Sequence, residues 1–138
     1  MQNLSLDIGS RLYANSSVNL AWLSVYGNTL QCDGEIGNGN TNDGIAFNIE
    51  GTTCVINGIG IFNAARIRKL TTTNPTTSLT ISMSINLRWE STNNTVLFNN
   101  TAAASYFNIT VNSGFTLSCL GGAINPGSVA IDGFKGAT

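Results

Sequence analysis

The sequence of 138 residues contains no histidine and few charged residues of either sign. Without histidine the chain lacks the commonest general base, the Ser-His and Cys-His nucleophile pairs, and the usual zinc and iron ligands. Charged residues make up only 9% of the chain and the net charge is −1, so there is no basic footprint for a nucleic acid. We therefore expect a protein that is not an enzyme and does not bind nucleic acid.

The seven acidic residues leave one enzymatic alternative open. Only Asp33 and Glu35 are close together in the sequence, on a glycine-rich stretch. A two-carboxylate glycosidase could also pair acids that are distant in the sequence. An enzyme acting on glycans therefore stays a distant alternative.

Cysteine and long apolar runs are equally sparse. Cys32, Cys54 and Cys119 form no CxxC pair, so neither a disulfide framework nor a zinc site is indicated. We expect all three thiols to be free and buried; the alternative is one bridge, such as Cys32–Cys54, which would indicate an oxidising compartment. No run approaches the roughly 18 apolar residues of a membrane span. We expect no metal, no cofactor and no membrane insertion.

What the chain does contain is a mixture of Asn, Thr, Ser and Gly among 42% hydrophobic residues. Ser, Thr and Asn compete for backbone hydrogen bonds and Gly costs helix entropy, so this composition favours strands and turns. The length suits one domain. We expect a single all-β head domain over residues 1–138, in which residues 1–17 lie next to a stalk or are poorly ordered.

Residues 79–89 carry the clearest pattern in the chain. Leu79, Ile81, Met83, Ile85, Leu87 and Trp89 alternate with polar residues, which is the period of a strand. One apolar and one polar face predict a strand of an antiparallel sheet that is covered on one side. At about 3.3 Å per residue it would be about 36 Å long and central to the fold.

Shorter alternations predict further strands, at 3–8, 18–26, 45–49, 53–56, 59–70, 96–98 and 128–137. Residues 107–111 and 115–119 predict a hairpin around Asn112-Ser113-Gly114. Eight to ten short strands without a helix favour a sandwich or barrel over an array of repeats. The strand at 18–26 is apolar on both faces and is expected to contact another subunit. Its expected interface residues are Leu20, Trp22, Leu23 and Tyr26.

Two loops and one basic cluster are candidates for binding. Residues 33–44 form a Gly- and Asn-rich loop that we rank first for a ligand, through Asp33, Asn38, Asn40, Asn42 and Asp43. A calcium loop is the lesser alternative there, because Asp43 and Ile49 replace residues that such a loop needs. Residues 90–94 rank second. The cluster Arg66, Arg68 and Lys69 suggests either an anion or receptor contact or, more simply, a solvated strand end.

The second half of the chain resembles the tumour necrosis factor and complement globular-head superfamily. Gly60-Ile61-Phe62 resembles its Gly-x-aromatic entry to a central strand, and 108–117 resembles its strand–turn–strand hairpin, with Phe115 in place of an acidic residue. Residues 128–134, Ser-Val-Ala-Ile-Asp-Gly-Phe, resemble its closing strand. The Thr-rich, charge-poor texture is closest to heads of bacterial collagen-like surface proteins and of viral or phage fibres. The resemblance covers the chain from about residue 45 onward.

The resemblance implies an antiparallel jelly-roll β-sandwich assembled as a homotrimer. It implies a non-catalytic head at the tip of a fibre, on an extracellular surface or a virion, that attaches to a receptor or carbohydrate and keeps the trimer in register. A purely structural trimerisation or capping module without a ligand is the alternative.

Overall fold

The computed structural model describes residues 1–14, 21–37, 44–69, 76–87, 96–100, 106–119 and 123–124. Within these ranges the regular structure consists of fifteen short strands and no helix. In chain order they are β1 (Leu4–Leu6), β2 (Arg11–Leu12), β3 (Ala21–Val25), β4 (Thr29–Cys32), β5 (Glu35–Ile36), β6 (Ile45–Ile49), β7 (Thr53–Asn57), β8 (Ile61–Ala64), β9 (Arg66–Lys69), β10 (Thr76–Ser82), β11 (Ile85–Leu87), β12 (Val96–Asn100), β13 (Tyr106–Val111), β14 (Leu117–Cys119) and β15 (Ala123–Ile124).

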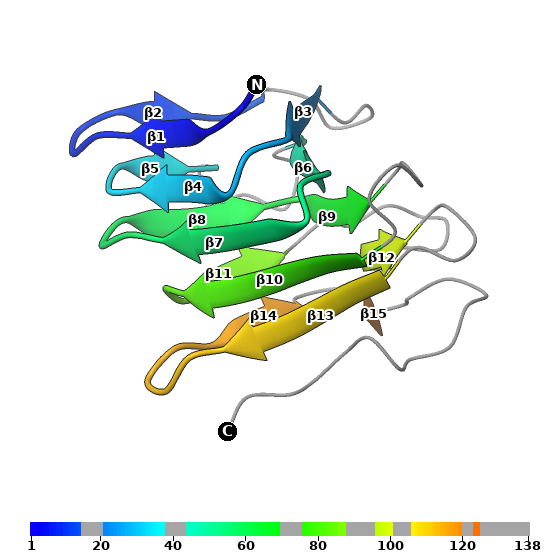
Figure 1. Ribbon diagram of the computed structural model, residues 1–138. Coiled ribbons are helices and arrows are strands. Elements are labelled where there is room, and N and C mark those ends of the chain that lie inside the picture. Colours follow the sequence, from blue (N-terminus) through cyan, green and yellow to red (C-terminus); the bar gives the residue numbers. More distant parts are fainter. Residues whose placement is uncertain are drawn as a thin grey trace.

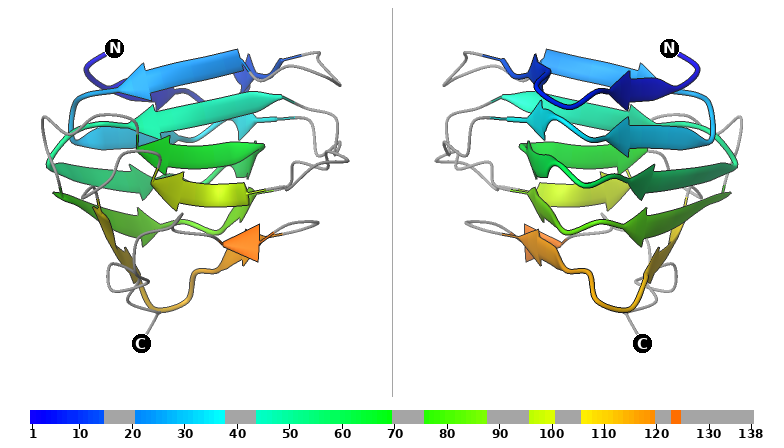
Figure 2. Two further views of the ribbon diagram at one scale, coloured as in Figure 1. Left: turned by 90° about the vertical axis from the view of Figure 1, so that its right-hand side faces the viewer. Right: turned by 90° about the vertical axis from the view of Figure 1, so that its left-hand side faces the viewer.

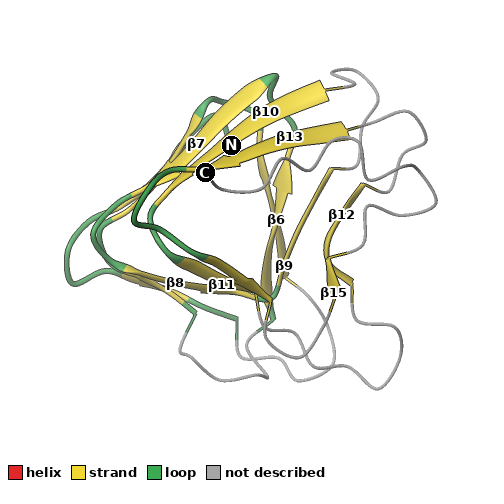
Figure 3. Cartoon of the chain, turned by 90° about the horizontal axis from the view of Figure 1, so that it is seen from below, coloured by secondary structure: helices red, strands yellow, loops and turns green. Residues whose placement is uncertain are grey.

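Each strand pairs with the strand that comes three places later in the chain, and all of these pairings are parallel. Sheet A has the order β1-β4-β7-β10-β13, sheet B the order β2-β5-β8-β11-β14, and sheet C the order β3-β6-β9-β12-β15. Three consecutive strands therefore make one coil, and five coils stack along an axis (Figures 1 and 2). Seen along that axis, the three sheets form the sides of a triangle around the core (Figure 3). The fold is a three-sided parallel β-solenoid.

The predicted antiparallel jelly roll is therefore wrong, and so is the preference for a sandwich over an array of repeats. The parallel pairing of β10 with both β7 and β13 overturns it. An alternating sequence specifies which residues face inward, but it does not specify the direction of the strand alongside. The resemblance that implied the jelly roll shared these alternations and not the topology.

The long strand predicted at 79–89 is two strands in two sheets. β10 ends at Ser82 in sheet A, Met83 and Ser84 form a corner, and β11 continues in sheet B. The predicted inward residues are nonetheless all inside: Leu79, Ile81, Met83, Ile85 and Leu87 are at most 2% exposed. Inward and outward residues continue to alternate through the corner, so the sequence gives no sign of the bend. Trp89 lies outside the described residues.

Two other predicted elements divide in the same way. The predicted strand 59–70 contains β8 in sheet B and β9 in sheet C, with Ala65 between them. The predicted hairpin is also wrong, because β13 pairs with β10 in sheet A whereas β14 pairs with β11 in sheet B. Its turn exists, and the Phe115 amide donates to the Asn112 carbonyl at 3.2 Å. By contrast, the strand predicted at 45–49 coincides with β6. The strand predicted at 128–137 lies outside the described residues.

Stacking places equivalent apolar residues of successive coils directly above one another. In sheet A the pairing aligns one inward row, Leu4, Leu30, Ile56, Ile81 and Val111. In sheet B it aligns Leu12, Ile36, Phe62, Ile85 and Leu117. Across the core, Phe47 of sheet C meets Phe62 of sheet B, with 5.6 Å between ring centroids. Neighbouring residues within a row lie 25 to 30 positions apart in most cases, which is the period of a solenoid repeat.

Candidate functional site

The outer face of sheet A is polar, and the outward side chains described on its strands are not ionisable; the Asp33 carboxylate lies at its edge, where it accepts from Gln31 Nε2 at 2.8 Å. Strand alternation turns these side chains away from the buried row. The outward residues of β4, β7, β10 and β13, with the residue that follows β13, are Thr29, Gln31, Thr53, Val55, Asn57, Ser78, Thr80, Ser82, Asn108, Thr110 and Asn112. Parallel strands repeat every 4.7–4.9 Å or so, so hydroxyl and amide groups recur regularly over this face.

Register and hydrogen bonds hold these polar groups in place. Gln31, Asn57 and Ser82 lie opposite one another on consecutive strands. The Asn112 amide donates to Ser82 Oγ at 2.7 Å, which continues the row to the next coil. A flat face with donors and acceptors in fixed positions suits a hydroxyl-rich ligand better than a charged one.

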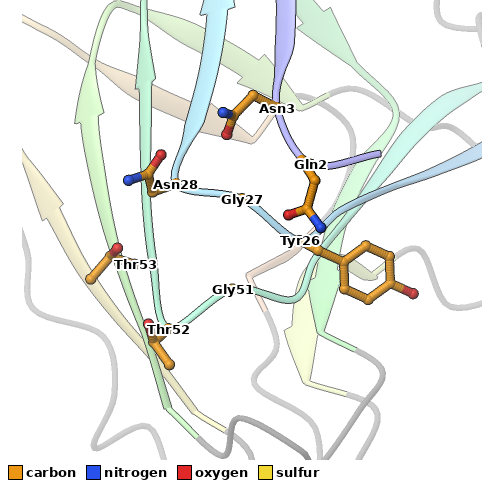
Figure 4. Close-up of a pocket in the computed structure, with 8 residues that line it drawn as sticks. All are labelled: Gln2, Asn3, Tyr26, Gly27, Asn28, Gly51, Thr52 and Thr53. Carbon is orange, nitrogen blue, oxygen red and sulfur yellow. The ribbon is translucent and has the colours of Figure 1, made fainter.

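An open pocket of about 360 Å³ lies where the chain turns from sheet C into sheet A, at the start of β4 and β7 (Figure 4). Its lining is Gln2, Asn3, Tyr26, Gly27, Asn28, Gly51, Thr52 and Thr53. We call this the corner pocket. In the view of Figure 4 the polar side chains surround Gly27 and Gly51, and the Tyr26 ring lies on the side opposite Thr53. Thr53 also belongs to the outer face of sheet A, so pocket and face are continuous.

Backbone hydrogen bonds build the corner pocket from three separate segments. The amides of Tyr26 and Gly27 donate to the carbonyls of Met1 and Gln2, at 3.0 and 2.5 Å. Asn3 Oδ1 accepts from the Thr29 amide at 3.2 Å. A side chain at Gly27 would collide with Asn3 Oδ1 and the Gln2 carbonyl, so glycine is needed for this close approach.

The second glycine of the pocket is held in a similar way. A Cβ on Gly51 would lie 2.8 Å from the Gly27 carbonyl oxygen. Thr77 Oγ1 donates to the Gly51 carbonyl at 2.5 Å from a fully buried position. The pocket floor is therefore fixed by the stacking of coils, while the side chains around it remain accessible.

The chemistry of the corner pocket is that of neutral hydrogen bonding beside an aromatic ring. Tyr26 is 54% exposed, so much of its ring is open to solvent. Asn and Gln amides offer both donors and acceptors, and the threonine hydroxyls do the same. Among the lining residues the only ionisable side chain is the Tyr26 phenol. An aromatic ring of this kind provides an apolar platform with a polar tip.

Asp33, the described member of the predicted ligand loop, has a structural role. Its Oδ1 accepts from Gln31 Nε2 at 2.8 Å and from the Ile59 amide at 3.1 Å. It thereby fixes the corner between β4 and β5, beside a second hollow of about 380 Å³. Glu35 lines the same hollow and its Oε2 is 2.9 Å from Arg11 Nε. The other predicted ligand residues, Asn38, Asn40, Asn42 and Asp43, lie outside the described residues, as do the calcium-loop alternative and residues 90–94.

The predicted interface residues do not share one face. Leu23 points toward the core and is partly buried, as the end position of its sheet allows. Trp22 points outward, where the Arg68 guanidinium carbon lies 3.4 Å from its ring centroid. Tyr26 belongs to the corner pocket, and Leu20 lies outside the described residues. The two apolar faces of this strand are thus explained within one chain, and the predicted subunit interface is not needed to account for them.

Cys32 and Cys54 are free and fully buried, which confirms the prediction for these two thiols. Burial raises the pKa of Cys54 from 9.0 to about 12. Burial likewise raises the pKa of Cys32 to about 11; the negative charge of Asp33 acts in the same direction, and the backbone hydrogen bond at Ile36 opposes it. The side chain of Cys119 lies outside the described residues. Both described thiols are therefore poor nucleophiles in the folded chain.

These raised pKa values predict a loss of stability in alkali. Unfolded thiols ionise near pH 8.5–9, so ionisation favours the unfolded chain above that pH. The stabilising contribution is complete below about pH 9 and is lost progressively as the pH rises toward the folded values of about 11 and 12. Denaturant unfolding should show this decline, and Cys54→Ala should reduce it. Titration in denaturant should find free thiols; an equal decline in Cys54→Ala would contradict the assignment.

The described residues contain no group of three or more His, Cys, Asp or Glu side chains able to hold a metal ion. No helix long and apolar enough to cross a membrane occurs in that part of the chain. Comparison with protein-family models, with curated proteins and with solved structures finds no match to this chain. The candidate functional site consists of the corner pocket and the outer face of sheet A.

Proposed function

We propose that this protein is a non-catalytic attachment module that binds a neutral carbohydrate. The corner pocket binds a sugar ring beside Tyr26, and the outer face of sheet A extends the contact along the saccharide. The single observation that carries the proposal is the continuity of an exposed tyrosine pocket with a face of hydroxyl and amide groups, which the Asp33 carboxylate borders at the far end of β4. The location that we propose for the module, a cell surface or virion fibre, rests on the sequence resemblance alone.

The chemistry of the pocket matches that of a neutral sugar. Each sugar hydroxyl both donates and accepts, and so do the amides of Gln2, Asn3 and Asn28 and the hydroxyls of Thr52 and Thr53. These side chains are exposed in the free protein, and polar groups that a ligand buries on binding need partners, so such complementarity selects hydroxyl-rich ligands over apolar ones. The flat ring of Tyr26 can pack against the C–H face of a sugar.

The glycosidase alternative has less support. The acids that are close in sequence each have a structural partner: Asp33 fixes a corner, and Glu35 pairs with Arg11. Neither carboxylate lines the corner pocket. A carboxylate pair that flanks a sugar needs both groups free to reach the glycosidic bond.

We keep self-association in this proposal without a fixed number of subunits. The homotrimer was implied by a jelly roll that the structure does not contain, so no observation now supports three subunits over another number. Shallow sugar sites bind weakly one at a time, and several copies held on one fibre raise the overall affinity by avidity. Light scattering on the purified chain measures whether copies associate without the fibre.

The test is a glycan array with the purified protein, followed by calorimetric titration of the best neutral hit. Tyr26→Ala is expected to weaken binding about tenfold or more, because it removes the stacking platform. Tyr13→Ala is the matched control, since Tyr13 is 55% exposed against 54% for Tyr26 and does not line the pocket. It should bind as the unmodified chain does.

Three outcomes would count against the proposal in different ways. Equal binding by the Tyr26→Ala and unmodified chains would remove the corner pocket as the site. Loss of binding on Asp33→Ala, with normal folding, would move the site to the second hollow. Absence of binding to any glycan would favour the purely structural module.

A further inference from the structure

Two arginines lie side by side on the outer face of sheet C, in a chain with only six basic residues. Pairing aligns Arg66 with Ala46 and Trp22 in one row, and Arg68 with Asn48 and Ser24 in the next. Ile67 between them is fully buried, so Arg66 and Arg68 both point outward. Residues two apart in a strand are separated by about 6.6 Å, so the two guanidinium groups can reach one ligand.

Arg68 is held in one position by its neighbours. Its Nε donates to Asn48 Oδ1 at 2.8 Å, and the Asn48 amide donates in turn to Ser24 Oγ at 2.9 Å. Its guanidinium carbon lies 3.4 Å from the centre of the Trp22 ring. The small side chain of Ala46 lies between the positions of Trp22 and Arg66 in the row. Arg68 is therefore preorganised, with less side-chain entropy to lose when a ligand binds.

Arg66, unlike Arg68, has an unsatisfied hydrogen-bond donor in the described part of the chain. Its Nε is buried and has no hydrogen-bond partner within the described structure. Burial lowers the pKa of Arg66. The pKa of Arg68 is also lowered, first by burial and then by repulsion from Arg66, whereas the negative charge of Glu50 acts to raise it. A buried donor without a partner is rare in folded proteins, and it shows that the inner part of the Arg66 guanidinium is removed from water. Because this partial burial reduces the competition from water, an anion at the accessible part of the guanidinium interacts with it more strongly than with a fully solvated arginine.

We propose that Arg66 and Arg68 form a binding site for an anionic group, a carboxylate or sulfate ester carried by an acidic saccharide. The planar guanidinium of Arg66 is only partly buried, and its terminal Nη groups can donate parallel hydrogen bonds to such a group. Arg68 adds a second positive charge from a fixed position.

This site does not depend on the proposed attachment to neutral sugars. It lies on a different sheet from the outer face of sheet A, and none of its residues lines the corner pocket. A solvated strand end is the simpler explanation of the two arginines, but Arg68 is held by Asn48 and Trp22 and Arg66 is partly buried, so neither side chain is freely solvated. The two proposals can therefore fail separately.

The experiment titrates the full chain with glucuronate, glucose 6-sulfate and glucose by calorimetry. We expect binding of one or both anions and none of glucose at this site. Arg66→Gln should weaken the anion affinity about tenfold or more, because it removes a charged donor pair. Arg66→Lys, which keeps the charge and loses the fork, should recover only part of the affinity. Arg11→Gln is the control, since Arg11 is exposed and already paired with Glu35.

Thermal unfolding gives a second measurement that does not need calorimetry. A ligand that binds the folded chain raises its melting temperature with concentration, so the active anion should stabilise the unmodified chain and not Arg66→Gln. Preference for glucuronate over glucose 6-sulfate, or the reverse, identifies the anionic group. Equal anion binding by Arg66→Gln and the unmodified chain would overturn the proposal, and so would an absence of binding by both anions.

Discussion

Replacement of Gly58 by alanine is expected to lower the free energy of unfolding by about 3 kcal/mol or more. Gly58 has a φ of +138°, which side-chain-bearing residues rarely adopt. A Cβ at this position would also collide with the carbonyl group of Cys32 in the coil above. The backbone strain and the steric collision would both occur at the corner between β7 and β8, where two coils are in direct contact. Equilibrium unfolding in urea, followed by circular dichroism, measures the loss.

Gly114→Ala separates the steric term from the backbone term. Gly114 also has a positive φ, +87°, but nothing lies within 4 Å of the position that a Cβ would take. Its substitution should therefore cost only the conformational penalty, about 1–2 kcal/mol. A loss in Gly58→Ala no larger than that in Gly114→Ala would mean that the coils do not meet at Gly58.

Met83→Asp is the second substitution with a large expected effect, a loss of about 4 kcal/mol or more. Met83 is 2% exposed at the corner that joins β10 to β11, and its side chain belongs to the core. An aspartate there would place an unpaired charge in an apolar interior. The same unfolding experiment applies, and failure to fold would agree with the largest expected loss.

Ser84→Asp is the matched control for Met83→Asp, because it introduces the same charge one residue later. Ser84 is exposed, and its Oγ accepts from the Thr116 amide at 3.2 Å. A carboxylate at this position can also accept that hydrogen bond, so the change in stability should stay within about 0.5 kcal/mol. Similar losses for the two variants would contradict the inward direction of Met83.

Which residues face the core could be predicted from sequence in several strands. The alternation from Leu79 to Leu87 identified five buried side chains correctly, although it spans two strands and a corner. The strand at 45–49 was placed correctly, although Ala46 and Asn48 on its outer face are buried as well. Period-two patterning reports the two faces of an extended chain, and this holds whichever neighbour the strand acquires.

The signal for the solenoid was present but indirect. Leu30, Ile56 and Ile81 lie 25 or 26 residues apart, and stacking aligns them in one row. The residue types differ from coil to coil, and the next step in the row, to Val111, is longer. Self-similarity of this kind is visible as a spacing of apolar positions and not as a repeated motif.

The candidate site shows the same division between local and tertiary information. Sequence singled out Tyr26 as one of the residues expected at a subunit interface. The corner pocket, however, combines residues 2–3, 26–28 and 51–53, which meet only because one coil stacks on the next. In the loop that was ranked first from sequence, Asp33 instead has a structural role, because the Asp33 carboxylate accepts hydrogen bonds from neighbouring segments at the corner.

By itself, the sequence determined that the regular structure consists of strands, that the inward-facing residues are mostly aliphatic, and that the outer faces carry few charges. These follow from composition and from alternation, which act within a few residues of each other. Only the tertiary structure decided that the strands run parallel, that the chain bends at Met83 and Ser84, that Cys32 and Cys54 form no bridge, and that Arg68 lies against Trp22 of another coil. Strand direction and stacking depend on contacts between residues about 26 positions apart, and no local pattern specifies them.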